Sequence, residues 1–182
     1  MMQIIQEQPE WVVVTKASGF LSVPGRGPDK ADSVAKRIAD RYQECIVQPA
    51  VHRLDMDTSG LMVLARTAQA HRHLSIQFQE RTTAKRYVAI LEGVVSDESG
   101  TIELPFRLDV ENRPYQIYDE EHGKMGTTHW RKLEVDNQGN TRIEFRPITG
   151  RTHQLRVHSA HALGLGIPIV GDPLYGLSLI HI

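Results

Sequence analysis

The stretch His52–Gly60 (HRLDMDTSG) decides how this chain is interpreted. It places two carboxylates, a histidine and an arginine within six residues, and it ends in three small residues that favour turns. The apolar run over 61–65 follows directly and predicts a strand buried on both faces. A polar turn that leads into such a strand can hold a reactive group rigidly and still expose it. The simpler interpretation, which composition alone favours, is a capped turn with an arginine salt bridge.

The rest of the chain divides into short strands and helices. β-Branched and alternating apolar runs predict strands, and apolar residues at helical spacing predict helices. The predicted strands cover 11–15, 60–65, 85–91, 102–108, 127–135 and 141–148; the predicted helices cover 31–43, 68–80 and 152–163. Asp32 or Ser33 and Thr67 are the expected N-caps, and 109–126 is expected to be a loop or hairpin that contacts substrate. This order predicts an α+β fold with a mixed, largely antiparallel central sheet and flanking helices.

Length and composition indicate one globular domain, or one domain plus an appendage, with a real apolar core. The 182 residues are 40% hydrophobic and 24% charged, with a net charge of −1. The single cysteine, Cys45, indicates a reducing compartment and a half-buried packing role, so we expect a cytoplasmic protein. No signal peptide or long apolar run is present, so no membrane association is expected. Near-neutral charge indicates a local basic cleft in place of a basic surface.

The same stretch also contains residue types that can ligate a metal or act as a nucleophile. His52, Asp55 and Asp57 could together ligate a metal and would then define a metal-dependent hydrolase. Their spacing matches no ligand pattern with a physical basis, so we expect no metal there. Ser59 lacks the surroundings of a catalytic serine.

A second stretch, 146–158 (RPITGRTHQLRVH), carries three arginines and two histidines without an acid. A turn at Gly150 and a helix beginning near Thr152 would present amide groups as well as arginines, and both bind phosphate. Apolar residues alternate with these charges, which indicates the half-buried wall of a cleft more than a solvated basic face.

These stretches resemble a known family. His52–Gly60 resembles the signature of the RluA-type pseudouridine synthases, and 85–93 (KRYVAILEG), 150–158 and 171–176 (GDPLYG) resemble their further motifs. The resemblance runs from about residue 11 to 176. The stretches 21–26 and 112–114 are similar to the dual-specificity members, which modify a tRNA anticodon stem-loop and a 23S rRNA loop. The resemblance to this family implies an isomerase that converts uridine in RNA to pseudouridine without metal or cofactor.

The resemblance also implies roles for individual residues. Asp55 is the essential aspartate, acting as nucleophile on the sugar or as base at C2′, and both alternatives stay open. Tyr87 stacks on the base and Arg156 pairs with the aspartate, which completes the catalytic set. The substrate contacts are Arg53, which fills the gap left by the flipped nucleotide, Leu155 against the base, and Arg151 and His52. Asp57 is expected to point to solvent and to be dispensable.

The end of the chain departs from the family pattern. We expect a catalytic domain over 11–176 that lacks the family's closing elements, an off-pattern tail over 177–182, and no S4 domain. The expected partner is RNA, bound by a monomer. A non-catalytic RNA-binding fragment is the alternative from a different class of function.

Overall fold

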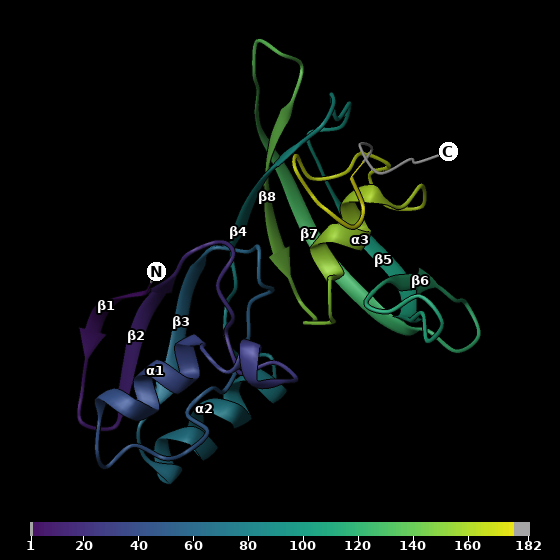
Figure 1. Ribbon diagram of the computed structural model, residues 1–182. Helices are drawn as coiled ribbons and strands as arrows, with labels where there is room; N and C mark the ends of the chain where they lie inside the picture. The colour runs from purple at the N-terminus through teal and green to yellow at the C-terminus, as the bar shows by residue number, and fades with distance from the viewer. Residues whose placement is uncertain (1, 177–182) are drawn as a thin grey trace. The chain divides into compact units, whose positions relative to one another are not determined.

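The computed structural model describes residues 2–176, which fold as two compact units. The first unit ends at Thr83 and the second begins at Ala84. Each unit has its own antiparallel sheet and its own helices (Figure 1). The predicted tail over 177–182 lies outside the described residues, and the domain boundaries at 11 and 176 stay a prediction.

The first unit is built on a three-stranded sheet in the order β1-β2-β3. Its strands are β1 (Met2–Glu7), β2 (Trp11–Lys16) and β3 (Gly60–Ala65). In the central strand Val12 and Val14 are buried, and they pair with the buried Leu64 and Met62 of β3. Because paired residues of neighbouring strands point to the same face, these four side chains form one apolar layer.

Two helices and one 3-10 turn complete the first unit. They are η1 (Pro28–Lys30), α1 (Val34–Arg41) and α2 (Ala68–Gln79). The hydroxyl of Ser33 accepts the amide hydrogen of Lys36, and that of Thr67 accepts the amide hydrogen of Ala70. Both predicted helix starts are therefore capped as expected, with Ser33 and not Asp32 at the first.

The second unit is a five-stranded sheet in the order β4-β8-β7-β5-β6. Its elements are β4 (Tyr87–Leu91), β5 (Ser99–Leu108), β6 (Gln116–Tyr118), β7 (Lys124–Val135), β8 (Thr141–Pro147) and α3 (Gln154–Ala160). Helix α3 packs on one face of this sheet, against β7 (Figure 1). The core between them is a cluster of buried apolar side chains: Leu91, Val95, Ile102, Leu104, Phe106, Trp130, Ile143, Phe145 and Val157.

The structure confirms the α+β class and the antiparallel pairing, with the strands divided between two sheets. Two strands were not predicted: β1 mixes polar and apolar residues and is largely exposed, and β6 has only 3 residues. Both form by pairing with a neighbour more than by their own pattern. The prediction that β3 is buried on both faces is wrong, because Leu61 is 61% exposed. Helix α3 is shorter than predicted, since the backbone at His161 is extended.

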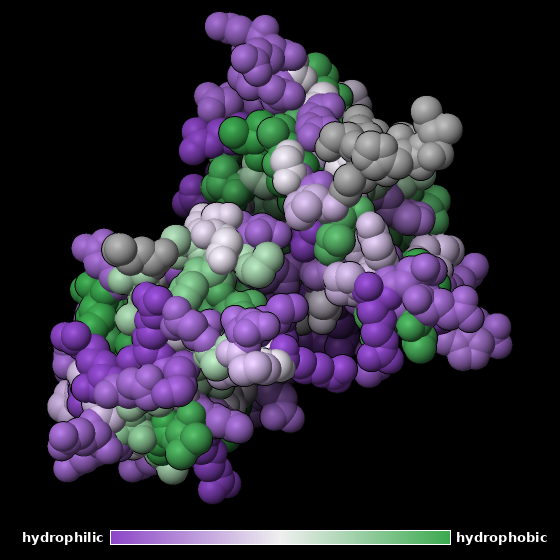
Figure 2. All heavy atoms as spheres, in the orientation of Figure 1, coloured by the Kyte–Doolittle hydropathy of each residue, from purple (hydrophilic) through white to green (hydrophobic). Residues whose placement is uncertain are grey.

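The surface agrees with the composition. Hydrophilic side chains cover most of the face seen in Figure 2, with apolar residues in smaller groups between them. Over residues 2–176, no helix combines the length and the apolar character that crossing a membrane requires.

Candidate active site

The loop that carries Asp55 is anchored at its centre by Leu54. The Leu54 side chain is buried, and both of its backbone polar groups bind the buried hydroxyl of Ser22. The amide of Leu54 donates to Ser22 Oγ at 3.0 Å, and Ser22 Oγ donates to the carbonyl of Leu54 at 2.7 Å. Two hydrogen bonds to one buried group fix the backbone on the N-terminal side of Asp55.

Lys16 fixes the other side of the same loop. Its buried ammonium donates to the carbonyls of Met56 and Phe20 at 2.7 Å each, and to that of Ala17 at 3.1 Å. Burial lowers the pKa of Lys16, and the carboxylates of Asp57 and Asp55 oppose that effect. The end of β2 is thus joined through one cation to the residue that follows Asp55. Lys16 was not among the site residues predicted from the sequence.

The loop enters β3 through His52 and Gly60. His52 Nε2 accepts the amide hydrogen of Val63 at 3.1 Å, and its ring stacks on Phe78 of α2 with centroids 4.5 Å apart. Gly60 adopts φ +141°, a conformation that side-chain-bearing residues rarely take, which explains a glycine there. These contacts show that His52 supports the loop internally; its predicted contact with substrate stays a prediction.

Within the loop, three polar side chains differ in exposure. Asp55 is half-buried, and its carbonyl accepts the amide hydrogen of Thr58 at 3.1 Å to close a turn. Arg53 and Asp57 are exposed. The expected orientation of Asp57 toward solvent is therefore confirmed, and its dispensability stays a prediction.

The second unit contributes Tyr87, Leu155 and Arg156. Tyr87 is the first residue of β4, pairs with Phe145 of β8, and packs with Leu155 against the core cluster. Arg156 lies on α3 beside Leu155. Tyr87 of the sheet and Leu155 of α3 therefore pack against the same core cluster, and Arg156 is the next residue of α3. Asp55 belongs to the first unit, so its pairing with Arg156 stays a prediction.

Arg156 is held by a bidentate ion pair with Asp172. Its Nη2 and Nε lie 2.6 and 2.8 Å from the two carboxylate oxygens, and only 12% and 3% of the two side chains are exposed. Burial alone would raise the pKa of Asp172, but the bond from Arg156 and the amides of Leu174 and Tyr175 hold it below its usual value. A fork-to-fork pair of this kind fixes the plane of the guanidinium.

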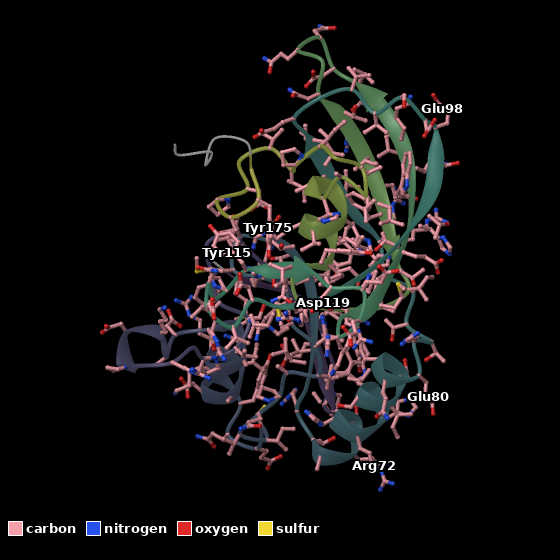
Figure 3. The ribbon with its side chains drawn as sticks, turned by 90° about the vertical axis from the view of Figure 1, so that its right-hand side faces the viewer. Arg72, Glu80, Glu98, Tyr115, Asp119 and Tyr175 are labelled. Carbon is pink, nitrogen blue, oxygen red and sulfur yellow. The ribbon has the colours of Figure 1, made fainter. Side chains whose placement is uncertain are left out.

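Tyr175 adds a second constraint on that arginine. The guanidinium carbon of Arg156 lies 5.2 Å from the centre of the Tyr175 ring. The hydroxyl of Tyr175 accepts the amide hydrogen of Gln116 at 2.8 Å and lies 3.0 Å from His153 Nδ1. Tyr115 meets the same ring edge to face, and Figure 3 shows the two tyrosines next to each other. The motif over 171–176 therefore aims Arg156, a role that its sequence did not reveal.

The turn before α3 is organised by the buried Gln154. Its Oε1 accepts from the hydroxyl of Thr149 at 2.7 Å and from the amide of Arg151 at 3.0 Å. Its Nε2 donates to the carbonyl of Thr127 and the hydroxyl of Thr128. Arg151 itself is exposed at this turn, which suits a phosphate contact.

Metal binding finds no support in the geometry. The part of the chain from residue 2 to 176 holds no group of three or more His, Cys, Asp or Glu side chains able to enclose an ion. His52 Nε2 accepts the amide hydrogen of Val63, and the His52 ring stacks on Phe78.

The chain thus combines an α+β fold, an aspartate in a fixed loop of the first unit, and an arginine of the second unit that a second carboxylate orients. Comparison with known proteins gives the family. The family model described as RNA pseudouridylate synthase matches residues 10–161, and the chain belongs to this family. The predictions of the family, and of an isomerase that acts on uridine in RNA, are confirmed.

Individual relatives are similar over nearly the whole chain. The dual-specificity RNA pseudouridine synthase RluA of Haemophilus ducreyi is 48% identical over 90% of this chain and 72% of its own length. The protein of that name from Escherichia coli is 44% identical over 94% and 76%. Among solved structures, human RNA pseudouridylate synthase domain containing 1 superposes with a TM-score of 0.77 at 28% identity, covering 97% of this chain and 70% of that one.

Proposed function

We propose that this chain converts a uridine in a tRNA anticodon stem-loop and a uridine in a 23S rRNA loop to pseudouridine, with Asp55 as the essential group. The observation that carries the proposal is the similarity to relatives named as dual-specificity enzymes, at 42–48% identity. Single-stranded loops suit the reaction because their bases can be splayed out and read individually.

The reaction rearranges the nucleotide without net gain or loss of atoms. The bond from N1 of uracil to C1′ of the ribose breaks, the base turns, and C5 bonds to C1′. The proton on C5 leaves and N1 gains one. Asp55 begins this sequence either by attacking C1′ or by removing the proton at C2′, and in both cases its carboxylate must be ionised.

Arg156 keeps Asp55 ionised in this proposal. A carboxylate enclosed with substrate tends to gain a proton, and an arginine within ion-pair reach lowers its pKa by about 1–3 units. The ion pair with Asp172 and the ring of Tyr175 support this role, because they hold the guanidinium in one plane. Asp172 is then a positioning residue, which acts on the reaction through Arg156.

The other site residues receive the substrate. Taking a base out of its stack costs roughly a few kcal/mol, and stacking on an aromatic ring such as Tyr87 returns about 1–3 kcal/mol. Leu155 covers the base, Arg53 fills the gap that the base leaves, and Arg151 binds a phosphate. His52 acts mainly by holding the start of the loop, in keeping with its contacts to Val63 and Phe78.

We also propose that the chain acts as a monomer in the cytoplasm. Support for the location comes from the single cysteine, Cys45, which cannot form an internal disulfide and so fits a reducing compartment. Light scattering with and without RNA would test the monomer: a mass of two chains in the free protein would contradict it.

The decisive experiment uses RNA labelled with tritium at C5 of uridine. An anticodon stem-loop and a 23S loop fragment are incubated with the protein, and release of tritium is followed together with binding. Release from both, in proportion to pseudouridine formed, is the expected result. Tight binding without release would instead support the non-catalytic RNA-binding alternative.

A further inference from the structure

The second unit has a sheet face that the proposed chemistry does not use. Successive residues of a strand point to opposite faces, so Val88 points away from the side on which Tyr87 packs against the core cluster. Val88 pairs with Glu144 of β8, and Glu144 pairs with Arg131 of β7. We call the face that these three residues share the outer face.

Glu144 lies at the centre of the outer face under three arginines. Only 1% of its side chain is exposed. Arg86 Nε lies 2.6 Å from Oε2, Arg146 Nη2 lies 2.8 Å from Oε1, and Arg131 Nη2 lies 3.6 Å from Oε1. The arginine side chains therefore bury the carboxylate from above, and they come from three different segments of the sheet.

The three arginines have far more hydrogen-bond donors than one carboxylate can accept. Each guanidinium has five N–H donors, about fifteen in all, whereas a carboxylate accepts about four hydrogen bonds. The side chains of Arg86, Arg131 and Arg146 are 67%, 59% and 62% exposed, respectively, so the remaining donors face solvent. Burial would raise the pKa of Glu144, but Arg146, Arg86 and Arg131 together hold it below its usual value. One ionised glutamate and three arginines leave a net charge of +2.

The space beside this cluster is concave. A hollow of about 200 Å³ is lined by His129, Trp130, Arg131, Glu144 and Arg146. The arginines at its rim are oriented in advance by Glu144, so an incoming anion need not order them itself. Arginine forks match the geometry of phosphate oxygens.

We propose that the outer face is a second RNA contact, in which Arg86, Arg131 and Arg146 bind backbone phosphates away from the target uridine. The proposal rests on the proposed function for the identity of the anion, since the substrate of this chain is RNA. RNA backbones carry a phosphate at every nucleotide, and binding them with arginine releases counterions and makes affinity depend on salt. Glu144 sets the geometry and takes no part in binding.

The test replaces two arginines and leaves the site residues untouched. In Arg131→Gln/Arg146→Gln, Arg86 remains to pair with Glu144, so the carboxylate keeps a partner. Arg142→Gln is the matched control, because Arg142 is on β8, half-exposed, and paired one to one with Glu134 at 3.1 Å. RNA affinity is measured by fluorescence anisotropy between 50 and 200 mM salt, beside kcat and KM.

We expect the double variant to bind the stem-loop about tenfold more weakly, with KM raised equally and kcat unchanged. The slope of log affinity against log salt should fall by about 1.4, since each phosphate contact to a single strand contributes about 0.7. Affinity and slope equal to those of Arg142→Gln would overturn the proposal. If the double variant unfolds, adding Glu144→Gln removes the buried negative charge that then has only Arg86 as a partner, and the same comparison applies.

Binding and turnover are read separately, so the two proposals fail in different ways. An unmodified protein that binds RNA through the outer face but releases no tritium would contradict the proposed function alone. A protein that forms pseudouridine at full rate after loss of both arginines, with unchanged KM, would contradict the outer face alone.

Discussion

At the residue scale, the two carboxylates of the loop from 52 to 60 differ in burial and in their expected roles. Asp55 is half-buried between the anchored Leu54 and Met56, whereas Asp57 is exposed. We expect Asp55→Asn to lower kcat by about 10²–10⁴-fold or more, the range for loss of an acid–base group. Asp57→Asn should stay within about twofold of the unmodified protein. Tritium release measures both, and an equally deep loss in Asp57→Asn would contradict the assignment.

Asp172 is the residue whose importance lies in what it orients. In Asp172→Asn one arm of the fork to Arg156 is lost, so the guanidinium is less well aimed. We expect kcat to fall about tenfold while KM for RNA changes little, because Arg156 acts on the reacting carboxylate. Asp119→Asn is the control: it breaks the ion pair with Arg107 in the same unit but touches no site residue. A rise in KM with unchanged kcat would show that Asp172 serves binding instead.

His158 makes the stability of the second unit depend on pH. The ring is fully buried beside Phe106, neither nitrogen has a hydrogen-bond partner within residues 2–176, and burial lowers its pKa from 6.5 to about 4. The unfolded chain binds a proton below pH 6.5 that the folded chain excludes. Stability is therefore full above pH 6.5 and falls on acidification, by about 3 kcal/mol at pH 4.

Urea unfolding between pH 4 and 7, followed for the unmodified protein and His158→Leu, checks this prediction. Leucine cannot titrate, so the free energy of unfolding of His158→Leu should fall about 3 kcal/mol less between pH 7 and pH 4 than that of the unmodified protein. Parallel curves would mean that other groups carry the pH dependence.

At the element scale, the loop from 52 to 60 is held by elements distant in sequence. Lys16 at the end of β2 binds the carbonyl of Met56 across 40 residues, and Ser22 binds Leu54 across 32. The buried strand behind the loop was expected to keep it rigid. In the structure, that rigidity comes as much from a buried cation and a buried hydroxyl.

Lys16→Met tests this clamp. The substitution leaves three carbonyl acceptors without their charged donor, which costs about 2–4 kcal/mol of stability. We expect a lower melting temperature and, at temperatures where the protein stays folded, a lower kcat because Asp55 is less well placed. Lys36→Met removes an exposed lysine paired with Asp40 and should change neither quantity.

At the scale of the whole molecule, charge and metal dependence separate the classes of function. The net charge of −1 contrasts with the +2 cluster of the outer face, so RNA is expected to be held by local basic sites. We expect pseudouridine formation to be unaffected by excess EDTA, because the proposed reaction uses the carboxylate of Asp55 and needs no metal ion. Activity that is lost with chelator and restored by a divalent ion would revive the hydrolase alternative.

Much of the fold could be predicted because its signals are local. The strands at β2, β3, β4 and β8 carry apolar or alternating patterns, and the caps Ser33 and Thr67 stand directly before their helices. The strands β1 and β6 could not be predicted in this way, because pairing with β2 and β5 holds them in place.

By itself the sequence determined the family, the reaction class and the chemical types at the site, since these depend on residue identity at fixed spacing. Only the tertiary structure decided which residues support them. Lys16 clamps the aspartate loop, Asp172 orients Arg156, and Glu144 gathers three arginines on the outer face. Each of these contacts joins segments that are distant in the sequence, through strand register and shared burial. Neither of these can be recognised from the local pattern of residues.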